Sequence, residues 1–259
     1  MLVLVKILTV VLFSFSLINI GHCDVEDLQE NTNIELLSKE TLFISLGSYC
    51  GPADFSRVTG FRKAAFPFDW IVSLDGEKLI RILEEDFLHF LDVRCLFPNS
   101  NGSALLNDCY HIEFVHEGGW KQEEFFANLE VLRSKYQRRI ERFRNLNHYE
   151  GKVCFLRAAY IRSDDDENRF FKSKDNVEIT PEHALKLYNA IEKRFPSLDF
   201  SLIIINPFAS GYHDIIEEKT LLDNLFMIRA PIENVEAMKV TYKTYFTKLL
   251  ENESSKRGL

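Results

Sequence analysis

Two kinds of apolar pattern alternate along the chain, one typical of strands and the other typical of helices. Short continuous apolar runs are typical of strands buried on both faces, and they occur at 41–46, 153–159, 202–205 and 225–228. Longer segments repeat apolar residues every three or four positions and predict helices, at 76–91, 121–146, 181–195 and 233–250. This alternation is typical of a layered α/β fold, with a largely parallel sheet flanked by helices.

The longest predicted helix, 121–146, carries one apolar stripe and a cluster of basic residues near its end. The stripe consists of Phe125, Leu129, Leu132, Tyr136, Ile140 and Phe143. The basic cluster consists of Arg138, Arg139, Arg142 and Arg144. Cations in the last turns of a helix complement its dipole, so we expect a solvated arginine face there, with anion docking as the alternative.

The N-terminus predicts export. Lys6 is followed by an apolar run, Ile7–Ile20, and Gly21 and Cys23 place small residues before a cut at Asp24. We therefore expect a signal peptide at 1–23, a loose leader at 24–40, one α/β domain at 41–251 and a disordered tail at 252–259. The mature chain would have no stable membrane span and would reside in the secretory pathway, in a periplasm, an endomembrane lumen or the exterior. A single-span anchor and a lipoprotein are the alternatives.

The net charge argues against one class of function, and the positions of the cysteines predict the state of each thiol. The formal net charge of −8 argues against non-specific nucleic-acid binding, which requires phosphate neutralisation. Cys95 and Cys109 flank a loop-like stretch and are the natural disulfide pair in an oxidising compartment. Cys154 lies in an apolar run and is expected as a buried thiol, which leaves Cys50 without an obvious partner. A Cys50–Cys154 disulfide is the structural alternative.

Cys50 follows a predicted strand and precedes a predicted helix. The partial positive charge at a helix N-terminus favours the thiolate and makes such a cysteine a candidate nucleophile. The turn residues Gly47, Ser48 and Gly51 would offer backbone amides to an oxyanion. The alternative is a small buried residue that packs under the helix.

A nucleophilic thiol needs a base, and two histidines stand at the ends of predicted strands. His116 follows the strand candidate 110–115, and His213 follows the strand 202–205. His183 stands in a polar helix-end context, where a solvated histidine is the expectation.

A third residue would orient the imidazole, and two residues qualify by type. Asp69 lies among aromatic residues in the segment Ala65–Trp70, so a desolvated carboxylate there must find a partner. That partner is either an imidazole or, in a salt bridge, Arg57 or Arg62. Asn206 follows the strand 202–205 and is the second candidate.

Several segments together resemble a known family. These are Ser45-Leu46-Gly47 through Cys50, Gly60-Phe61-Arg62, Ala65-Phe66-Pro67-Phe68-Asp69-Trp70, Phe114-x-His116 and Val153-x-Phe155-Leu156-Arg157. The pattern resembles uncharacterised proteins grouped as a papain-like cysteine peptidase family. The resemblance implies Cys50 as nucleophile and His116 as base, and marks Arg62 and Arg157 as further site residues.

The resemblance has departures. Glu117 and Gly118-Gly119-Trp120 do not belong to the family pattern. A papain-like α+β fold, the alternative fold class, places its nucleophile on a long helix and its histidine on an antiparallel sheet. The alternation of strands and helices found here fits a parallel sheet better.

These observations predict a thiol hydrolase or acyltransferase that acts on a peptide or another acyl substrate and uses neither a metal nor a cofactor. Two alternatives come from other classes. The acidic run Asp164–Glu167 could hold a divalent cation on a nucleotide-sugar, as in a glycosyltransferase, although such runs are usually solvated. A non-catalytic secreted binding module is the other.

Overall fold

The computed structural model describes residues 41–58, 60–117, 119–121, 124–159, 178–209 and 217–232. The predicted signal peptide, leader, closing helix 233–250 and tail lie outside these residues and stay predictions. Among the helices of the described part, none is long and apolar enough to cross a membrane.

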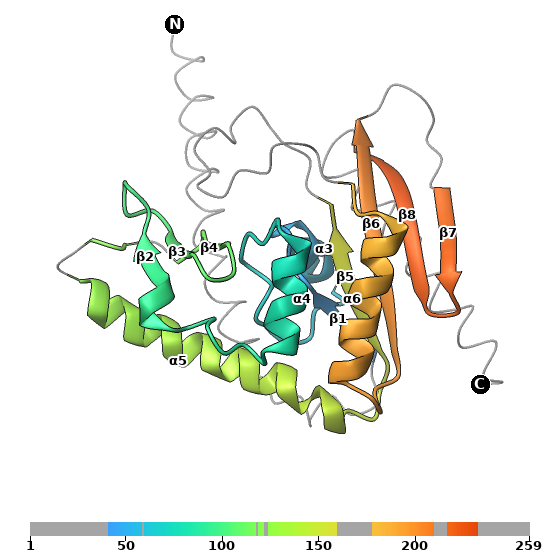
Figure 1. The fold of residues 1–259 in the computed structure, drawn as a ribbon, viewed down its shortest axis with the longest axis horizontal. Coiled ribbons are helices and arrows are strands. Elements are labelled where there is room, and N and C mark those ends of the chain that lie inside the picture. Colours follow the sequence, from blue (N-terminus) through green and yellow to red (C-terminus); the bar gives the residue numbers. More distant parts are fainter. Residues whose placement is uncertain are drawn as a thin grey trace, which may run out of the picture.

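The main sheet has five strands, and most of them are parallel (Figure 1). Four parallel neighbours follow in the order β1 (Leu42–Ser45), β5 (Val153–Ala158), β6 (Phe200–Ala209) and β8 (Leu225–Ile232). An antiparallel strand, β7 (Glu217–Leu222), which the apolar pattern did not reveal, pairs with β8 at the edge. The predicted α/β class with a largely parallel sheet is therefore confirmed.

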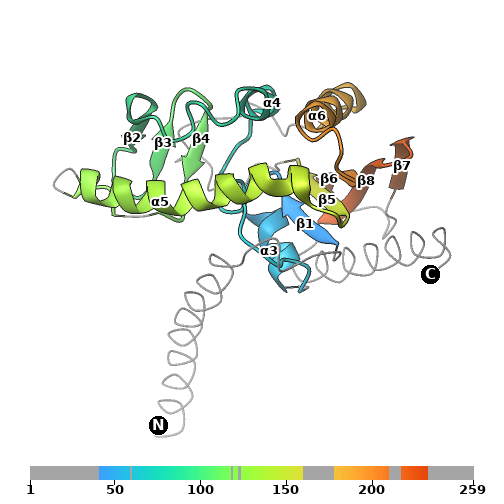
Figure 2. The same cartoon turned by 90° about the horizontal axis from the view of Figure 1, so that it is seen from below.

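Helices cover both faces of this sheet. The helices are α3 (Gly51–Val58), α4 (Gly76–Glu84), α5 (Phe125–Arg144) and α6 (Pro181–Arg194), with short 3-10 turns at Val93–Cys95 and Asn145–His148. Figure 2 shows α3 on one face of the sheet and α4 and α6 on the other. The start of α6 is set by Thr180, whose hydroxyl accepts a bond from the His183 amide, with Pro181 at the first position.

Strand alternation divides the apolar residues into two cores. Leu42, Ile44 and Phe155 point to the face covered by α4, α5 and α6. Phe43 and Leu156 point to the other face, where they pack with Phe55 of α3. Both faces are apolar because helices cover both, which is why these strands read as continuous hydrophobic runs.

A second, antiparallel sheet of three strands stands beside the first. Its strands are β2 (Leu96–Pro98), β3 (Leu105–Asn107) and β4 (Ile112–Phe114). The predicted disulfide between Cys95 and Cys109 is confirmed, with Cα atoms 5.6 Å apart. It connects the residue before β2 to the turn between β3 and β4. Val72 pairs with Glu113 of β4 and attaches this sheet to the segment that follows Trp70.

The helix expected over 76–91 is shorter than predicted and ends at Glu84. Asp86 and Phe87 adopt positive φ angles of 49° and 62°, which a continuing helix excludes. Arg144 donates to the backbone carbonyl and the carboxylate of Asp86 and so holds the turn. The turn lets Phe87 and Phe90 enter the core, so their helical spacing reflects burial and not a helix.

The arginine cluster of α5 is not the solvated face that we expected. Arg139 is fully buried with its guanidinium 4.9 Å from the Tyr136 ring centroid. Arg142 is 8 % exposed and donates to the Ala65 carbonyl. Arg138 does lie on the exposed side. The expectation is therefore wrong for Arg139 and Arg142, because the segment around Ala65 packs against this part of the helix.

Candidate functional site

A strained turn connects β1 to α3 and carries Cys50 at its end. Gly47 and Ser48 have φ angles of +74° and +84°. A Cβ on Gly47 would lie 2.6 Å from the Ser73 hydroxyl, so only glycine fits there. The Ser73 amide donates to the Ser48 carbonyl over 3.0 Å, and its hydroxyl accepts from the Ser48 amide at 3.1 Å. Ser73 therefore holds both the backbone amide and the backbone carbonyl of Ser48.

The guanidinium of Arg157, at the end of β5, holds the same turn. Its Nη1 donates to the Leu46 carbonyl at 2.8 Å and to the Ser73 hydroxyl at 2.9 Å, and its Nη2 donates to the Ser73 carbonyl at 2.6 Å. The side chain is buried, and burial lowers the pKa of Arg157 to about 9, while Asp75 acts to raise it. Arg157, which the resemblance marked, is therefore a positioning residue for the Cys50 turn.

Cys50 lies directly before the first residue of α3 and is half-buried. Cys154 is buried on β5, and the alternative disulfide between these two cysteines is not formed. A half-buried thiol at the N-terminus of a helix experiences the partial positive charge of the first turn, which stabilises its thiolate. Cys50 therefore stands between a strand and a helix, as the sequence predicted.

The turn amides are used differently from what we predicted. The Gly47 amide donates to the Ser45 hydroxyl at 3.0 Å, and the Ser48 amide is occupied by Ser73. Gly51 opens α3, where the first backbone amides have no intrahelical acceptor. The Tyr49 ring covers Gly51 so closely that an added Cβ would lie 2.2 Å from Cε2. Pro52 has no amide hydrogen and the Asp54 amide donates to the Cys50 carbonyl, so the amides of Gly51 and Ala53 are those at the start of α3 that have no intrahelical acceptor.

Asp69 is engaged by an arginine. Its Oδ2 accepts from Arg62 Nε at 3.1 Å, from Arg62 Nη2 at 2.9 Å and from the Phe66 amide at 2.8 Å. Both side chains are almost fully buried. The salt bridge that we held open for Asp69 is therefore present, and no imidazole of the described residues is among its hydrogen-bond partners.

His116 follows β4 and packs against the aromatic segment. Its ring centroid lies 5.5 Å from that of Trp70 in an edge-on arrangement, and the histidine is exposed. The Arg62 guanidinium lies 5.3 Å from the centroid of the same Trp70 ring. Trp70 therefore links His116 to the buried Arg62–Asp69 pair.

Successive contacts connect the Cys50 turn, the segment from Trp70 to Ser73, and β4 with His116. The Cys50 turn is bonded to Ser73, Val72 is paired with Glu113 of β4, and Trp70 contacts His116 beyond the end of β4. The segment from Trp70 to Ser73 runs between the Cys50 turn and β4, and so connects the parts of the chain that carry Cys50 and His116.

Asn206, the second candidate for the orienting residue, holds the backbone that leads into α6. Asn206 is buried on β6, and its amide group makes two bonds of 2.9 Å to the backbone of Ile179, so it anchors the approach to α6. His213 and the acidic run Asp164–Glu167 lie outside the described residues.

His183, which sequence reasoning did not select as a site residue, lies beside the turn. His183 lines a cavity of about 160 Å³ together with Ser48, Gly76 and Arg157. We expected it to be solvated, yet a Cβ on Gly76 would lie 2.2 Å from its Nε2. The sequence around His183 does not predict its contact with Gly76, because the starts of α4 and α6 come together only in the folded chain.

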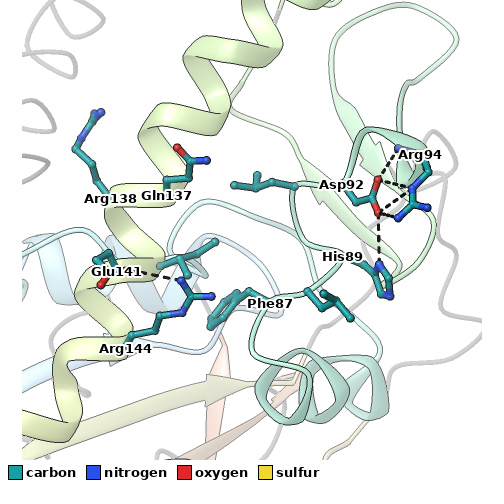
Figure 3. Close-up of a pocket in the computed structure, with 11 residues that line it drawn as sticks. Phe87, His89, Asp92, Arg94, Gln137, Arg138, Glu141 and Arg144 are labelled. Carbon is teal, nitrogen blue, oxygen red and sulfur yellow. Dashed lines mark hydrogen bonds and ion pairs between the residues drawn. The ribbon is translucent and has the colours of Figure 1, made fainter.

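A larger hollow of about 820 Å³ lies between residues 87–94 and α5 (Figure 3). Four of its charged residues form two pairs, Asp92 with Arg94 at 2.6 Å and Glu141 with Arg144 at 3.5 Å, while Arg138 donates to the Ser134 carbonyl. Arg94 holds the pKa of Asp92 well below its usual range. His89, Asp92 and Cys95 come close enough for a metal, but the disulfide occupies the Cys95 sulfur and Arg94 occupies Asp92. This hollow therefore offers neither a thiol nor a ready ligand set.

Comparisons with known proteins give a family but no activity. The chain is 25% identical to "Uncharacterized protein R408" of Acanthamoeba polyphaga mimivirus over 212 residues, which cover 71% of this chain and 86% of that protein. No solved structure matches the chain. A family model described as "Putative papain-like cysteine peptidase" matches residues 41–209, which include the turn, the aromatic segment, β4 with His116, and Arg157. The chain belongs to this family.

Proposed function

We propose that the protein is a thiol hydrolase or acyltransferase in which Cys50 is the nucleophile and His116 the base. The observation that carries the proposal is the position of the Cys50 thiol. It is half-buried at the N-terminus of α3, after a turn that Ser73 and Arg157 hold fixed. Preorganised attack geometry of this kind is what nucleophilic catalysis requires.

The reaction proceeds in two steps, the acylation of Cys50 and the transfer of the acyl group to water or to an acceptor. The Cys50 thiolate forms a bond to a substrate carbonyl carbon, and the carbonyl electron pair moves to oxygen, where amides at the start of α3 stabilise it. The tetrahedral adduct expels an amine or alkoxide, which takes a proton from the His116 imidazolium. Water, or an acceptor nucleophile in an acyltransferase, then gives its proton to His116 and cleaves the thioester.

Packing against Trp70 contributes to the orientation of the His116 imidazole. Trp70 lies edge-on to His116, and the Arg62–Asp69 pair supports Trp70 from the interior. Asp69 therefore acts as a positioning residue through Arg62 and Trp70.

Acyl-enzyme trapping tests this proposal. A panel of nitrophenyl esters and thioesters should give a burst of leaving group and one added acyl mass on the Cys50 peptide. The burst should vanish in Cys50→Ala and persist in Cys154→Ala, the matched buried thiol. Acylation of Cys154 instead, or none in wild type at any ester, would reject the proposed nucleophile.

We also propose that the protein matures in the secretory pathway. The support is the apolar run Ile7–Ile20 and the Cys95–Cys109 disulfide, which is typical of oxidising compartments. The mature protein isolated from its host should begin at Asp24. A retained Met1 with reduced Cys95 and Cys109 would contradict this assignment.

A further inference from the structure

The cavity beside the Cys50 turn stands where parallel sheets bind ligands. It lies beyond the carboxyl ends of β1 and β5, and the first residues of α4 and α6 close it. Ser48 and Arg157 line one side and His183 the other. In open parallel α/β sheets, ligands bind at this edge, because the loops that follow the strands converge there.

Arg157 brings a buried positive charge to this cavity. It is 3 % exposed, and it donates hydrogen bonds to the Leu46 carbonyl and to the hydroxyl and carbonyl of Ser73. Across the described parts of the chain, none of its hydrogen bonds reaches a carboxylate. Buried arginines usually have an anionic partner, since the cost of removing the charge from water is otherwise uncompensated.

The start of α6 adds to the positive potential, whereas the first amides of α4 already donate to the Asp75 carboxylate. Gly76 opens α4 and Thr180 caps α6, and both line the cavity. The amides of a first turn carry partial positive charge and suit anions. The His183 ring lies directly on Gly76 and adds a nitrogen that can donate.

The acidic residues near Arg157 have partners of their own. Asp75 Oδ1 accepts from the amides of Glu77 and Lys78 as the cap of α4. Glu178, on the cavity wall, is 3.6 Å from Arg229 Nε. Asp75 offsets the charge of Arg157 from a distance, but neither carboxylate is hydrogen-bonded to it, so the cavity is where a directly bonded counter-ion to this guanidinium would fit.

We propose that this cavity binds the oxyanion group of a ligand, a carboxylate or a phosphate, with Arg157 as the charged partner and the starts of α4 and α6 as its walls. A volume of about 160 Å³ suits one such group and not a whole drug-sized molecule. Ser48 lies two positions before Cys50, so the remainder of an anchored ligand would extend along the turn that carries the thiol. The proposal goes beyond the thiol chemistry and does not require it.

The test measures anion binding to the full mature chain by calorimetry, with acetate and inorganic phosphate as separate probes. Leu74 lines the cavity and is half-buried, so its replacement can place a carboxylate inside without removing Arg157. Leu74→Glu should bind either probe at least tenfold more weakly than the isosteric Leu74→Gln, and it should melt at a higher temperature because the new carboxylate pairs with Arg157.

The outcomes are distinct from those of the thiol proposal. Saturable binding of acetate alone or phosphate alone supports the site and identifies the group that it takes. Cys50→Ala should bind the anion as wild type does, even though it cannot be acylated. If neither probe binds wild type, or if Leu74→Glu and Leu74→Gln bind alike, the anion site is rejected whatever Cys50 does.

Discussion

Arg62 donates from both Nε and Nη2 to a single oxygen of Asp69, at 3.1 and 2.9 Å, and both side chains are withdrawn from solvent. The same oxygen accepts the Phe66 amide. The pair therefore fixes the fold of the segment that carries Trp70, and its influence on His116 passes through the Trp70 ring.

Removing this carboxylate charge should destabilise the fold strongly. We expect Asp69→Asn to lower the free energy of unfolding by about 3 to 5 kcal/mol, because it removes the buried carboxylate that accepts two hydrogen bonds from the buried Arg62 guanidinium. The half-buried pair of Asp54 with Arg57, one turn apart on α3, provides the control, and Asp54→Asn should cost under about 1 kcal/mol. Urea denaturation measures both. A stable Asp69→Asn that loses its thiol reactivity would instead indicate direct contact with the imidazole.

The Ser73 hydroxyl should matter more than that of Ser45. Ser73→Ala removes the acceptor of the Ser48 amide and one acceptor of Arg157, both buried, which should cost about 1 to 3 kcal/mol. Ser45→Ala removes a single bond, to the Gly47 amide two positions along. Chemical denaturation of the two variants compares them. Equal losses would show that the Ser73 hydroxyl does not hold the turn.

The disulfide should stabilise the three-stranded sheet. Cys95 and Cys109 are 14 positions apart, and closing a loop of this length contributes about 3 kcal/mol. A dithiol reductant should therefore lower the melting temperature of wild type and leave the Cys95→Ala/Cys109→Ala variant unchanged. If the reductant also lowers the melting temperature of that variant, the effect does not come from this disulfide.

Alkaline pH should destabilise the protein through Tyr110. Burial raises the pKa of Tyr110 to about 12, and its hydroxyl donates to Glu85 at 2.8 Å. The unfolded chain releases this proton near pH 10 and the folded chain retains it, so stability is complete below about pH 10 and falls as the pH rises toward 12. Tyr110→Phe should show a flatter decline in unfolding free energy across that window. Parallel curves for the two proteins would contradict the assignment.

Periodicity predicted the layers because burial is repeated along each element. Leu202 to Ile205 read as a strand covered on both faces, and alternate residues of β6 do enter the two cores. The apolar stripe of 121–146 likewise predicted the buried face of α5. Where the same spacing came from a turn, as at Phe87 and Phe90, the prediction extended the helix too far.

The site was predictable only in its locally encoded parts. A thiol between a strand and a helix identifies the place of Cys50, and the aromatic segment identifies a buried Asp69. The partner of Asp69, the burial of Arg139 and Arg142, and the contact of His183 with Gly76 depend on segments that meet only in the folded chain. Residue type at one position does not specify such contacts.

The pH dependence of Cys50 alkylation by iodoacetamide tests the central claim most directly, measured in Cys154→Ala between about pH 5 and about pH 8. A thiolate stabilised by the α3 N-terminus and by His116 should react at the acidic end of this range faster than the same chain in denaturant. His116→Gln should move the reaction back toward the pH dependence of an ordinary thiol. If Cys50 reacts no faster than in the unfolded chain and His116→Gln changes nothing, the claim that Cys50 is an activated nucleophile is wrong.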